Sequence, residues 1–97
     1  MQYKFEWNPI KAKRNLNKHG ISFQEATEVF SDPLQLTLED KKHSIGEERW
    51  ITIGNTKSQR LHLVVHTYVE YFNDHIIVRI ISARPATRYE QRQYKEI

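Results

Sequence analysis

The sequence has no cysteine among its 97 residues, and it has only three glycines and three prolines. Without cysteine the chain can form neither a disulfide nor a thiolate metal site, and this composition suits a reducing cytosol. The three glycines are isolated from one another, so there is no glycine-rich loop to cradle a phosphate. These absences exclude a disulfide-stapled secreted fold, a cysteine-based zinc module and a P-loop nucleotide enzyme.

Long apolar runs are missing as well. No stretch of 18 apolar residues occurs, and the first six residues, Met-Gln-Tyr-Lys-Phe-Glu, lack the apolar centre of a signal peptide. From this we expect a soluble, cytoplasmic protein that has no contact with a membrane.

Ligands for a metal ion are also scarce. His62 and His66 are four residues apart, which is ligand spacing on a helix, but they fall in a predicted strand. At ~3.3 Å per residue they would lie about 13 Å apart along one face, too far to share an ion. No H-E-x-x-H motif is present. We therefore expect no metal and no cofactor.

The composition that remains is that of a small basic domain. A chain of 97 residues suits one domain spanning residues 1–97. The formal charge is +3, and residues 75–97 account for all of it, with five Lys or Arg against two Glu. A basic end of this kind suits a polyanion or an acidic protein partner.

Hydrophobic periodicity and capping signals predict the order β-α-α-β-β-β-β-α. Asn8-Pro9 is typical of a helix start and Gly20 of its end, while Ser22 to Glu25 forms a capping box for a second helix. The pattern predicts an α+β domain, with a meandering antiparallel sheet and helices mostly on one face. The predicted strands are 3–7, 34–38, 49–54, 61–69 and 76–83.

Residues 76–90 form the stretch around which the chain is organised. A β-branched strand runs into a helix start, where Thr87 and Glu90 have the spacing of a capping box. The positive end of a helix favours anions, and the planar fork of arginine suits phosphate. The alternative is that the arginines form surface ion pairs with Glu90 and Glu96. The arginines near this junction are Arg79, Arg84 and Arg88.

A metal-free ribonuclease would need a base, an acid and cations that hold the phosphate. The histidine side chain titrates in a suitable range, and strand 61–69 supplies His66, but on the strand pattern alone a half-buried structural histidine is the better explanation. If strand 61–69 pairs with strand 76–83 through a five-residue turn, residues of equal parity share a face. That face would carry His62, His66, Ser82 and Arg84, with Arg60 at its margin and Arg79 on the opposite face.

Six blocks of residues in register resemble the BrnT toxin family. They are Phe5-Glu6-Trp7-Asn8-Pro9, Asn15 to Phe23 (N-L-N-K-H-G-I-S-F), Glu25 to Pro33, His43 to Gly54 (H-S-I-G-E-E-R-W-I-T-I-G), Val65-His66-Thr67, and Arg79 to Glu90. The family is the toxin half of a bacterial type II toxin–antitoxin pair and is similar to RelE-type ribonucleases in fold.

The resemblance implies a curved antiparallel sheet, with an N-terminal helical pair packed on it and a C-terminal helix. It also implies RNA cleavage without a metal, and neutralisation by a BrnA-like antitoxin. That partner carries a ribbon-helix-helix DNA-binding part, so operator DNA would be bound through the antitoxin.

Carried onto this sequence, the resemblance implies roles for eight residues. The scissile phosphate would be held by Arg84 and Arg88, assisted by Arg49 or Arg60, with Arg79 and Lys18 as further cations, and the proton carrier would be His66 or His19. Family members often have another basic residue where this chain has Pro85. Pro85 favours the alternative of a non-catalytic module that binds only its antitoxin or nucleic acid.

Overall fold

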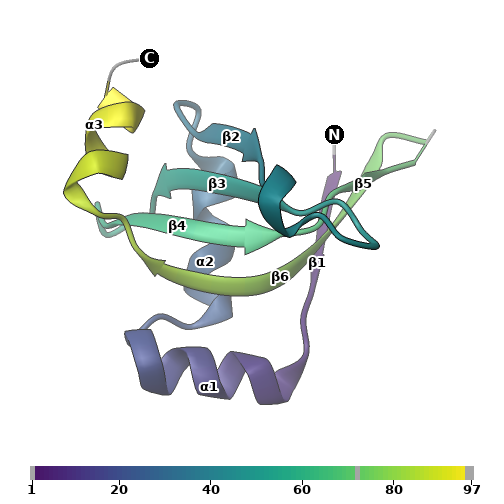
Figure 1. The fold of residues 1–97 in the computed structure, drawn as a ribbon, viewed down its shortest axis with the longest axis horizontal. Coiled ribbons are helices and arrows are strands. Elements are labelled where there is room, and N and C mark those ends of the chain that lie inside the picture. Colours follow the sequence, from purple (N-terminus) through teal and green to yellow (C-terminus); the bar gives the residue numbers. More distant parts are fainter. Residues whose placement is uncertain (1, 72, 96–97) are drawn as a thin grey trace.

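A six-stranded mixed sheet with helices on both faces forms the centre of the protein (Figure 1). The strand order is β1-β6-β4-β3-β2, and β5 pairs with β6 outside this path. The computed structural model describes residues 2–71 and 73–95. Its elements are β1 (Gln2–Glu6), α1 (Pro9–His19), α2 (Phe23–Thr27), the 3-10 helix η1 (Glu28–Ser31), β2 (Leu36–Glu39), the 3-10 helix η2 (Lys41–His43), β3 (Trp50–Asn55), β4 (Leu61–His66), β5 (Val69–Glu70), β6 (His75–Pro85) and α3 (Arg88–Lys95).

The predicted α+β class is confirmed, as are the N-terminal helices and the C-terminal helix. The sheet differs from the wholly antiparallel one expected, because β1 runs parallel to β6. This pairing covers only the first half of β6, with Gln2 opposite His75 and Glu6 opposite Arg79. The other neighbouring strands pair antiparallel. The predicted strand 61–69 ends at His66, and Val69–Glu70 forms the separate strand β5. Helices also cover both faces of the sheet, where mostly one face was expected.

Helix α1 takes the place of β1 beside the second half of β6 (Figure 1). The buried side chain of Asn15 accepts the N–H of Ala83 at 3.0 Å, and its amide donates to the carbonyl of Ala83 at 2.8 Å. The same amide donates to the carbonyl of Ile21 at 3.1 Å. Asn15 thus supplies the hydrogen bonds that a further strand would have made at this edge.

The predicted ends of α1 are confirmed. The Asn8 side chain accepts the N–H groups of Ile10 and Lys11, and Gly20 ends the helix at a φ of 72°. The two caps set where α1 begins and ends, and the edge of β6 sets where it docks. As a result, the last turn of α1 lies at the end of the sheet.

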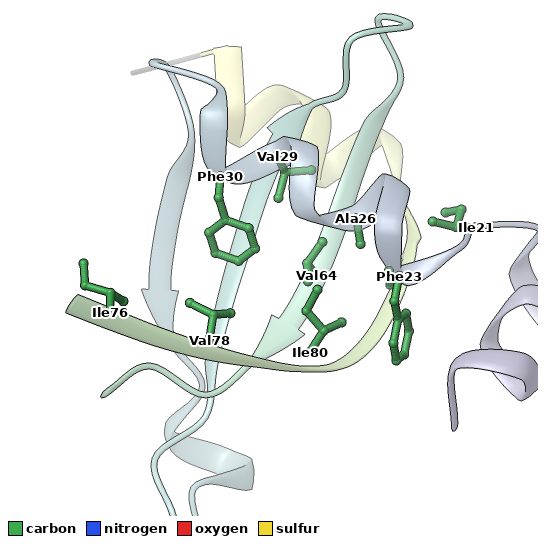
Figure 2. Close-up of a cluster of buried hydrophobic side chains, with 10 residues drawn as sticks. Ile21, Phe23, Ala26, Val29, Phe30, Val64, Ile76, Val78 and Ile80 are labelled. Carbon is green, nitrogen blue, oxygen red and sulfur yellow. The ribbon is translucent and has the colours of Figure 1, made fainter. Parts of the chain in front are cut away.

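The larger hydrophobic core lies between α2–η1 and one face of β4 and β6 (Figure 2). We call this face the α2 face. Gly54 allows η1 to approach the sheet, because a Cβ atom there would lie 2.9 Å from the carbonyl oxygen of Val29. The labelled core side chains are Ile21, Phe23, Ala26, Val29, Phe30, Val64, Ile76, Val78 and Ile80.

The opposite face carries a smaller core beneath α3, and we call it the α3 face. Ile53, Leu63 and Ala86 are buried there, with Tyr94 of α3 packed against them. The Tyr94 hydroxyl donates to Asp32 at 2.6 Å and ties α3 to the segment after η1. Among the described residues no helix is both long and apolar enough to cross a membrane.

Candidate functional site

The junction between β6 and α3 contains the predicted capping box in full. The Thr87 N–H donates to Glu90 at 2.9 Å, and the Glu90 N–H donates to the Thr87 hydroxyl at 3.2 Å. The Arg84 guanidinium grips the same carboxylate with two hydrogen bonds of 2.8 Å each. These bonds from Arg84 hold the pKa of the Glu90 carboxyl below its usual value. Arg84 therefore forms the ion pair considered as the alternative to phosphate binding, and the second alternative partner, Glu96, lies outside the described residues.

The prediction that His66 and Arg84 share a face is wrong. The register shifts between Val65 and His66, so that His66 pairs with Ile80 whereas Arg84 pairs with Leu63. A shift of one residue moves the following side chains to the other face of a strand. His66 consequently lies on the α2 face, and Arg84 lies on the α3 face.

The same strand pairing shows on which face the other residues predicted to lie beside Arg84 are found. His62 pairs with Pro85 and stays on the α2 face, while Ser82 pairs with Val65 and lies on the α3 face with Arg84. Arg79, expected on the face opposite Arg84, belongs to the α3 face as well, because its neighbours Val78 and Ile80 are buried in the α2-face core.

His66 is fully buried, at 0% exposure. Its Nε2 lies 2.7 Å from the Thr52 hydroxyl and its Nδ1 2.9 Å from the Thr67 carbonyl oxygen. Since a carbonyl can only accept, Nδ1 carries the proton and Nε2 accepts from Thr52. Burial lowers the pKa of His66 to about 4, so the ring is neutral near pH 7.

His19 occupies a different setting, at the C-terminal end of α1. Together with Lys18 it lines a groove between α1 and β6, which reaches Ser82 on the strand. Lys11 and Arg14 add two more cations from the same helix. No Asp or Glu is found among the described residues that line this groove.

Two further hollows continue from this groove. The middle one, which we call the end pocket, lies at the end of the sheet and shares His19 with the groove. Arg60 and Gln91 also line it, and Gln91 is shared with the third hollow, on α3. The three hollows adjoin one another through these shared residues, and together we call them the basic track. Its lysines and arginines are Lys11, Arg14, Lys18, Arg60, Arg88, Arg92 and Lys95.

Among the described residues that line the basic track there is no carboxylate. A surface with one sign of charge concentrates ligands of the opposite sign. The track can therefore hold an extended polyanion, and the predicted residues Lys18, His19, Arg60 and Arg88 all lie on it.

Three of the remaining predicted residues lie near the other end of the central strands, whereas the fourth, Arg84, is bound to Glu90 of α3. Arg49 precedes Trp50, which pairs with His66, whereas Arg60 precedes Leu61 at the opposite end of β4. Five residue steps separate the two ends, or about 17 Å in a strand. Arg79 forms an ion pair with Glu47 in a hollow that is also lined by Glu6 and Glu48. The structure thus separates Arg49, Arg79 and His66 from the basic track.

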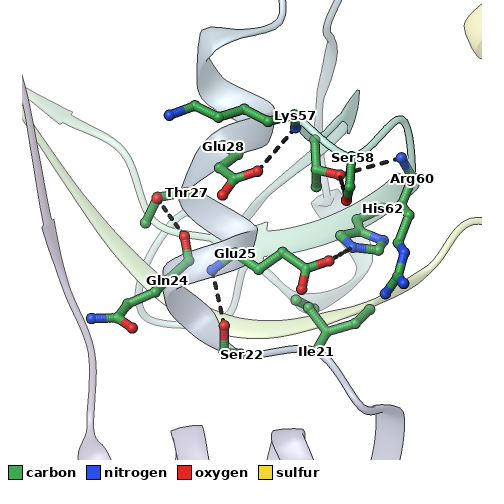
Figure 3. A network of polar contacts seen from close by, with 12 residues as sticks. Ile21, Ser22, Gln24, Glu25, Thr27, Glu28, Lys57, Ser58, Arg60 and His62 are labelled. Atoms are coloured by element: carbon green, nitrogen blue, oxygen red, sulfur yellow. Dashed lines mark hydrogen bonds and ion pairs between the residues drawn. The ribbon is translucent and has the colours of Figure 1, made fainter.

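Sequence reasoning missed one polar pair beside the track (Figure 3). The Ser22 hydroxyl accepts the N–H of Glu25, as the capping box predicted, but the Glu25 carboxylate bonds to His62 Nε2 at 2.6 Å. No spacing rule could have paired these two residues, which are 37 positions apart. No cluster of three or more His, Asp or Glu that could hold a metal occurs in the described part of the chain.

Comparison with known proteins agrees with this architecture. A crystal structure of the Brucella abortus ribonuclease toxin BrnT matches with a TM-score of 0.63 and 20% identity, covering 91% of this chain and all of that one. The likeness shows a shared fold. No curated protein matches the sequence. The family described as "ribonuclease toxin, BrnT, of type II toxin-antitoxin system" matches residues 7–90, and the chain therefore belongs to the BrnT family.

Proposed function

We propose that this ribonuclease toxin cleaves RNA without a metal ion, with the RNA backbone on the basic track and His19 as the proton carrier. The basic lining of the track, with no carboxylate among the described residues there, supports this most directly, because RNA presents one negative charge per nucleotide. His19 is placed where the groove and the end pocket meet, so a phosphate that crosses from one to the other passes it.

The chemistry assigned to these groups is an attack by the RNA 2′-hydroxyl on the adjacent phosphorus. His19 would take the hydroxyl proton as the new bond forms a 2′,3′-cyclic phosphate, and it would give that proton to the 5′-oxygen of the next nucleotide as the bond from phosphorus to this oxygen breaks. Lys18 would stabilise the charge that builds on the phosphate oxygens. His66 is a poorer candidate for proton transfer because it is fully buried and has both ring nitrogens occupied by neighbouring groups. In this proposal His66 is a structural residue.

In this proposal Arg84 still contacts a phosphate, but RNA must first displace Glu90 from its guanidinium. In the free protein the carboxylate of Glu90 satisfies the fork of Arg84, and RNA would take its place. A non-catalytic module is the second candidate function, and it is favoured by this same occupied fork. Pro85, which has no N–H to offer a phosphate, favours it too.

The partner in this proposal is a BrnA-like antitoxin that covers the basic track with an acidic or amphipathic segment. A type II toxin family implies a cognate antitoxin. The charge of the track would speed the association of an acidic partner. The antitoxin's ribbon-helix-helix part would bring the complex to operator DNA.

The deciding experiment measures single-turnover cleavage of RNA by the full chain in the presence of EDTA. We expect cleavage to persist with EDTA, and His19→Ala to slow it by about 100-fold or more, the usual contribution of a general base. His43→Ala is the matched control, because His43 is exposed and pairs with Asp40 outside the track. Loss of cleavage with EDTA and its recovery with a divalent ion would overturn the metal-free mechanism. Full activity of His19→Ala would remove His19 from it, and no cleavage by the parent chain would favour the binding module.

A further inference from the structure

The end pocket differs from the two hollows beside it in having several apolar residues in its lining, together with polar ones. Its volume is about 410 Å³. Ile21, Leu61 and Pro85 contribute apolar surface, whereas Arg60 and Gln91 provide polar groups. An apolar surface with a few polar groups at its edge is typical of pockets for planar ligands.

His62 lines this pocket and has an unsatisfied ring nitrogen. Its side chain is 4% exposed, and Nε2 bonds to the Glu25 carboxylate. A carboxylate only accepts, so Nε2 carries the proton and Nδ1 of the neutral ring is left as an acceptor. Within the described chain Nδ1 has no hydrogen-bond partner, and such a buried group is costly unless a donor reaches it.

We propose that the end pocket is a base subsite that takes adenine or cytosine and bonds its exocyclic amino group to His62 Nδ1. This rests on the basic track being the RNA path given above. A strand that passes from the groove on α1 to the hollow on α3 carries one nucleotide across the pocket, because His19 and Gln91 join the three surfaces.

A single acceptor in the pocket would separate adenine and cytosine from guanine and uracil. Adenine and cytosine carry an amino donor on the Watson–Crick edge at the position where guanine and uracil carry a carbonyl oxygen. A carbonyl there would face the lone pair of Nδ1, leaving two acceptors opposed. The flat face of the base would lie on the apolar residues of the lining, and the Arg60 guanidinium could stack on it.

Access to Nδ1 requires a movement at the rim. The atom is shielded in the free protein, and Arg60 is an exposed residue whose side chain lies on the other side of the His62 ring from Glu25 (Figure 3). Turning this side chain onto the face of a bound base would open the way to Nδ1. Glu25 would keep the ring in place throughout.

The test is calorimetric titration of the full chain with the four nucleoside 3′-monophosphates, which are not substrates for cleavage. We expect 3′-AMP and 3′-CMP to bind about tenfold more tightly than 3′-UMP and 3′-GMP, the gain typical of one added hydrogen bond to a buried group. His62→Leu should abolish the preference, while His43→Leu, the matched control, should keep it.

A second measurement needs no substitution. In nitrogen-detected NMR spectra of the parent protein, the Nδ1 signal of His62 should shift on addition of 3′-AMP and stay in place with 3′-UMP. Equal affinities for the four nucleotides, an unchanged preference in His62→Leu, or an unmoved Nδ1 signal would each overturn the subsite.

The titration also separates the subsite from the proposed function, because binding of a mononucleotide does not require cleavage. Selective binding by a chain that leaves RNA intact would support the subsite and reject the cleavage mechanism. Cleavage by a chain that binds all four nucleotides equally would support the cleavage mechanism and reject the subsite.

Discussion

At the scale of single residues, the two histidines of β4 show how burial decides what an imidazole can do. His66 has a hydrogen-bond partner for each nitrogen and a pKa of about 4, lowered by burial. His62 is nearly as buried, but within the described chain its Nδ1 has no hydrogen-bond partner. The first histidine thus has both nitrogens satisfied, and the second is the one that the proposed base subsite would use.

Protonation of His66 should couple folding to pH. The pKa of a histidine in the unfolded chain is about 6.5. Below that pH the unfolded state binds a proton that folded His66 does not take up until about pH 4. The contribution of neutral His66 to the free energy of unfolding is therefore complete above pH 6.5. As the pH falls towards 4, this contribution is lost, and the free energy of unfolding drops by up to about 3 kcal/mol.

We expect urea unfolding to show this loss between pH 7 and pH 4.5. The variant His66→Gln, whose amide can meet the same two partners, should show a smaller loss than the parent chain. His43→Gln is the control, because His43 is exposed and should leave the loss unchanged. A parent-like loss in His66→Gln would mean that other groups cause the pH dependence.

At the scale of elements, one buried side chain helps to fix the position of α1. Asn15 makes three hydrogen bonds to backbone groups, two of them with Ala83 at the edge of β6. Its amide thereby connects a basic helix to the sheet, and it sets the distance of Lys18 and His19 from Ser82. Local sequence rules predict the helix, but they do not say where it docks.

Replacing Asn15 by Ala should lower the free energy of unfolding by about 3 kcal/mol, because it leaves buried backbone groups of Ala83 unsatisfied. Asn17→Ala is the matched control on the same helix, since Asn17 is exposed and should change stability by less than about 0.5 kcal/mol. Urea denaturation of both variants measures the difference. Similar stabilities of the two variants would contradict the role given to Asn15.

At the scale of the whole molecule, positive charge gathers on one side. The basic track runs over α1, the end of the sheet and α3, while the ion pair of Arg79 and Glu47 lies in a hollow lined by two more glutamates. The basic track and this hollow therefore differ in the sign of the charges that line them. This asymmetry orients a polyanion before any specific contact forms.

Binding of RNA along the track should depend strongly on salt. We expect the logarithm of the binding constant to fall linearly with the logarithm of the salt concentration. For single-stranded RNA, Lys18→Gln and Arg88→Gln should each make the slope about 0.7 less steep. The control is Lys41→Gln, in η2 outside the track. Fluorescence anisotropy with a 2′-O-methyl oligonucleotide, which cannot be cleaved, measures the slopes. Equal slopes in all variants would exclude the track as the RNA path.

The sequence by itself determined the features that depend on near neighbours. Caps at Asn8, Gly20 and the pair Thr87–Glu90 lie where their residue types predict, since capping involves residues only a few positions apart. The strand pattern and the family blocks likewise determined the α+β class and the BrnT family.

Only the tertiary structure decided which residues meet. One extra residue in β6, between Ile80 and Ser82, put Ser82 and Arg84 on the face opposite His66, because it inverts the alternation of that strand. Packing of α2 on β4 joined Glu25 to His62. The docking of α1 and α3 at one end of the sheet brought Lys18, Arg60 and Arg88 onto one surface. Such contacts depend on long-range packing, for which neither periodicity nor spacing carries a signal.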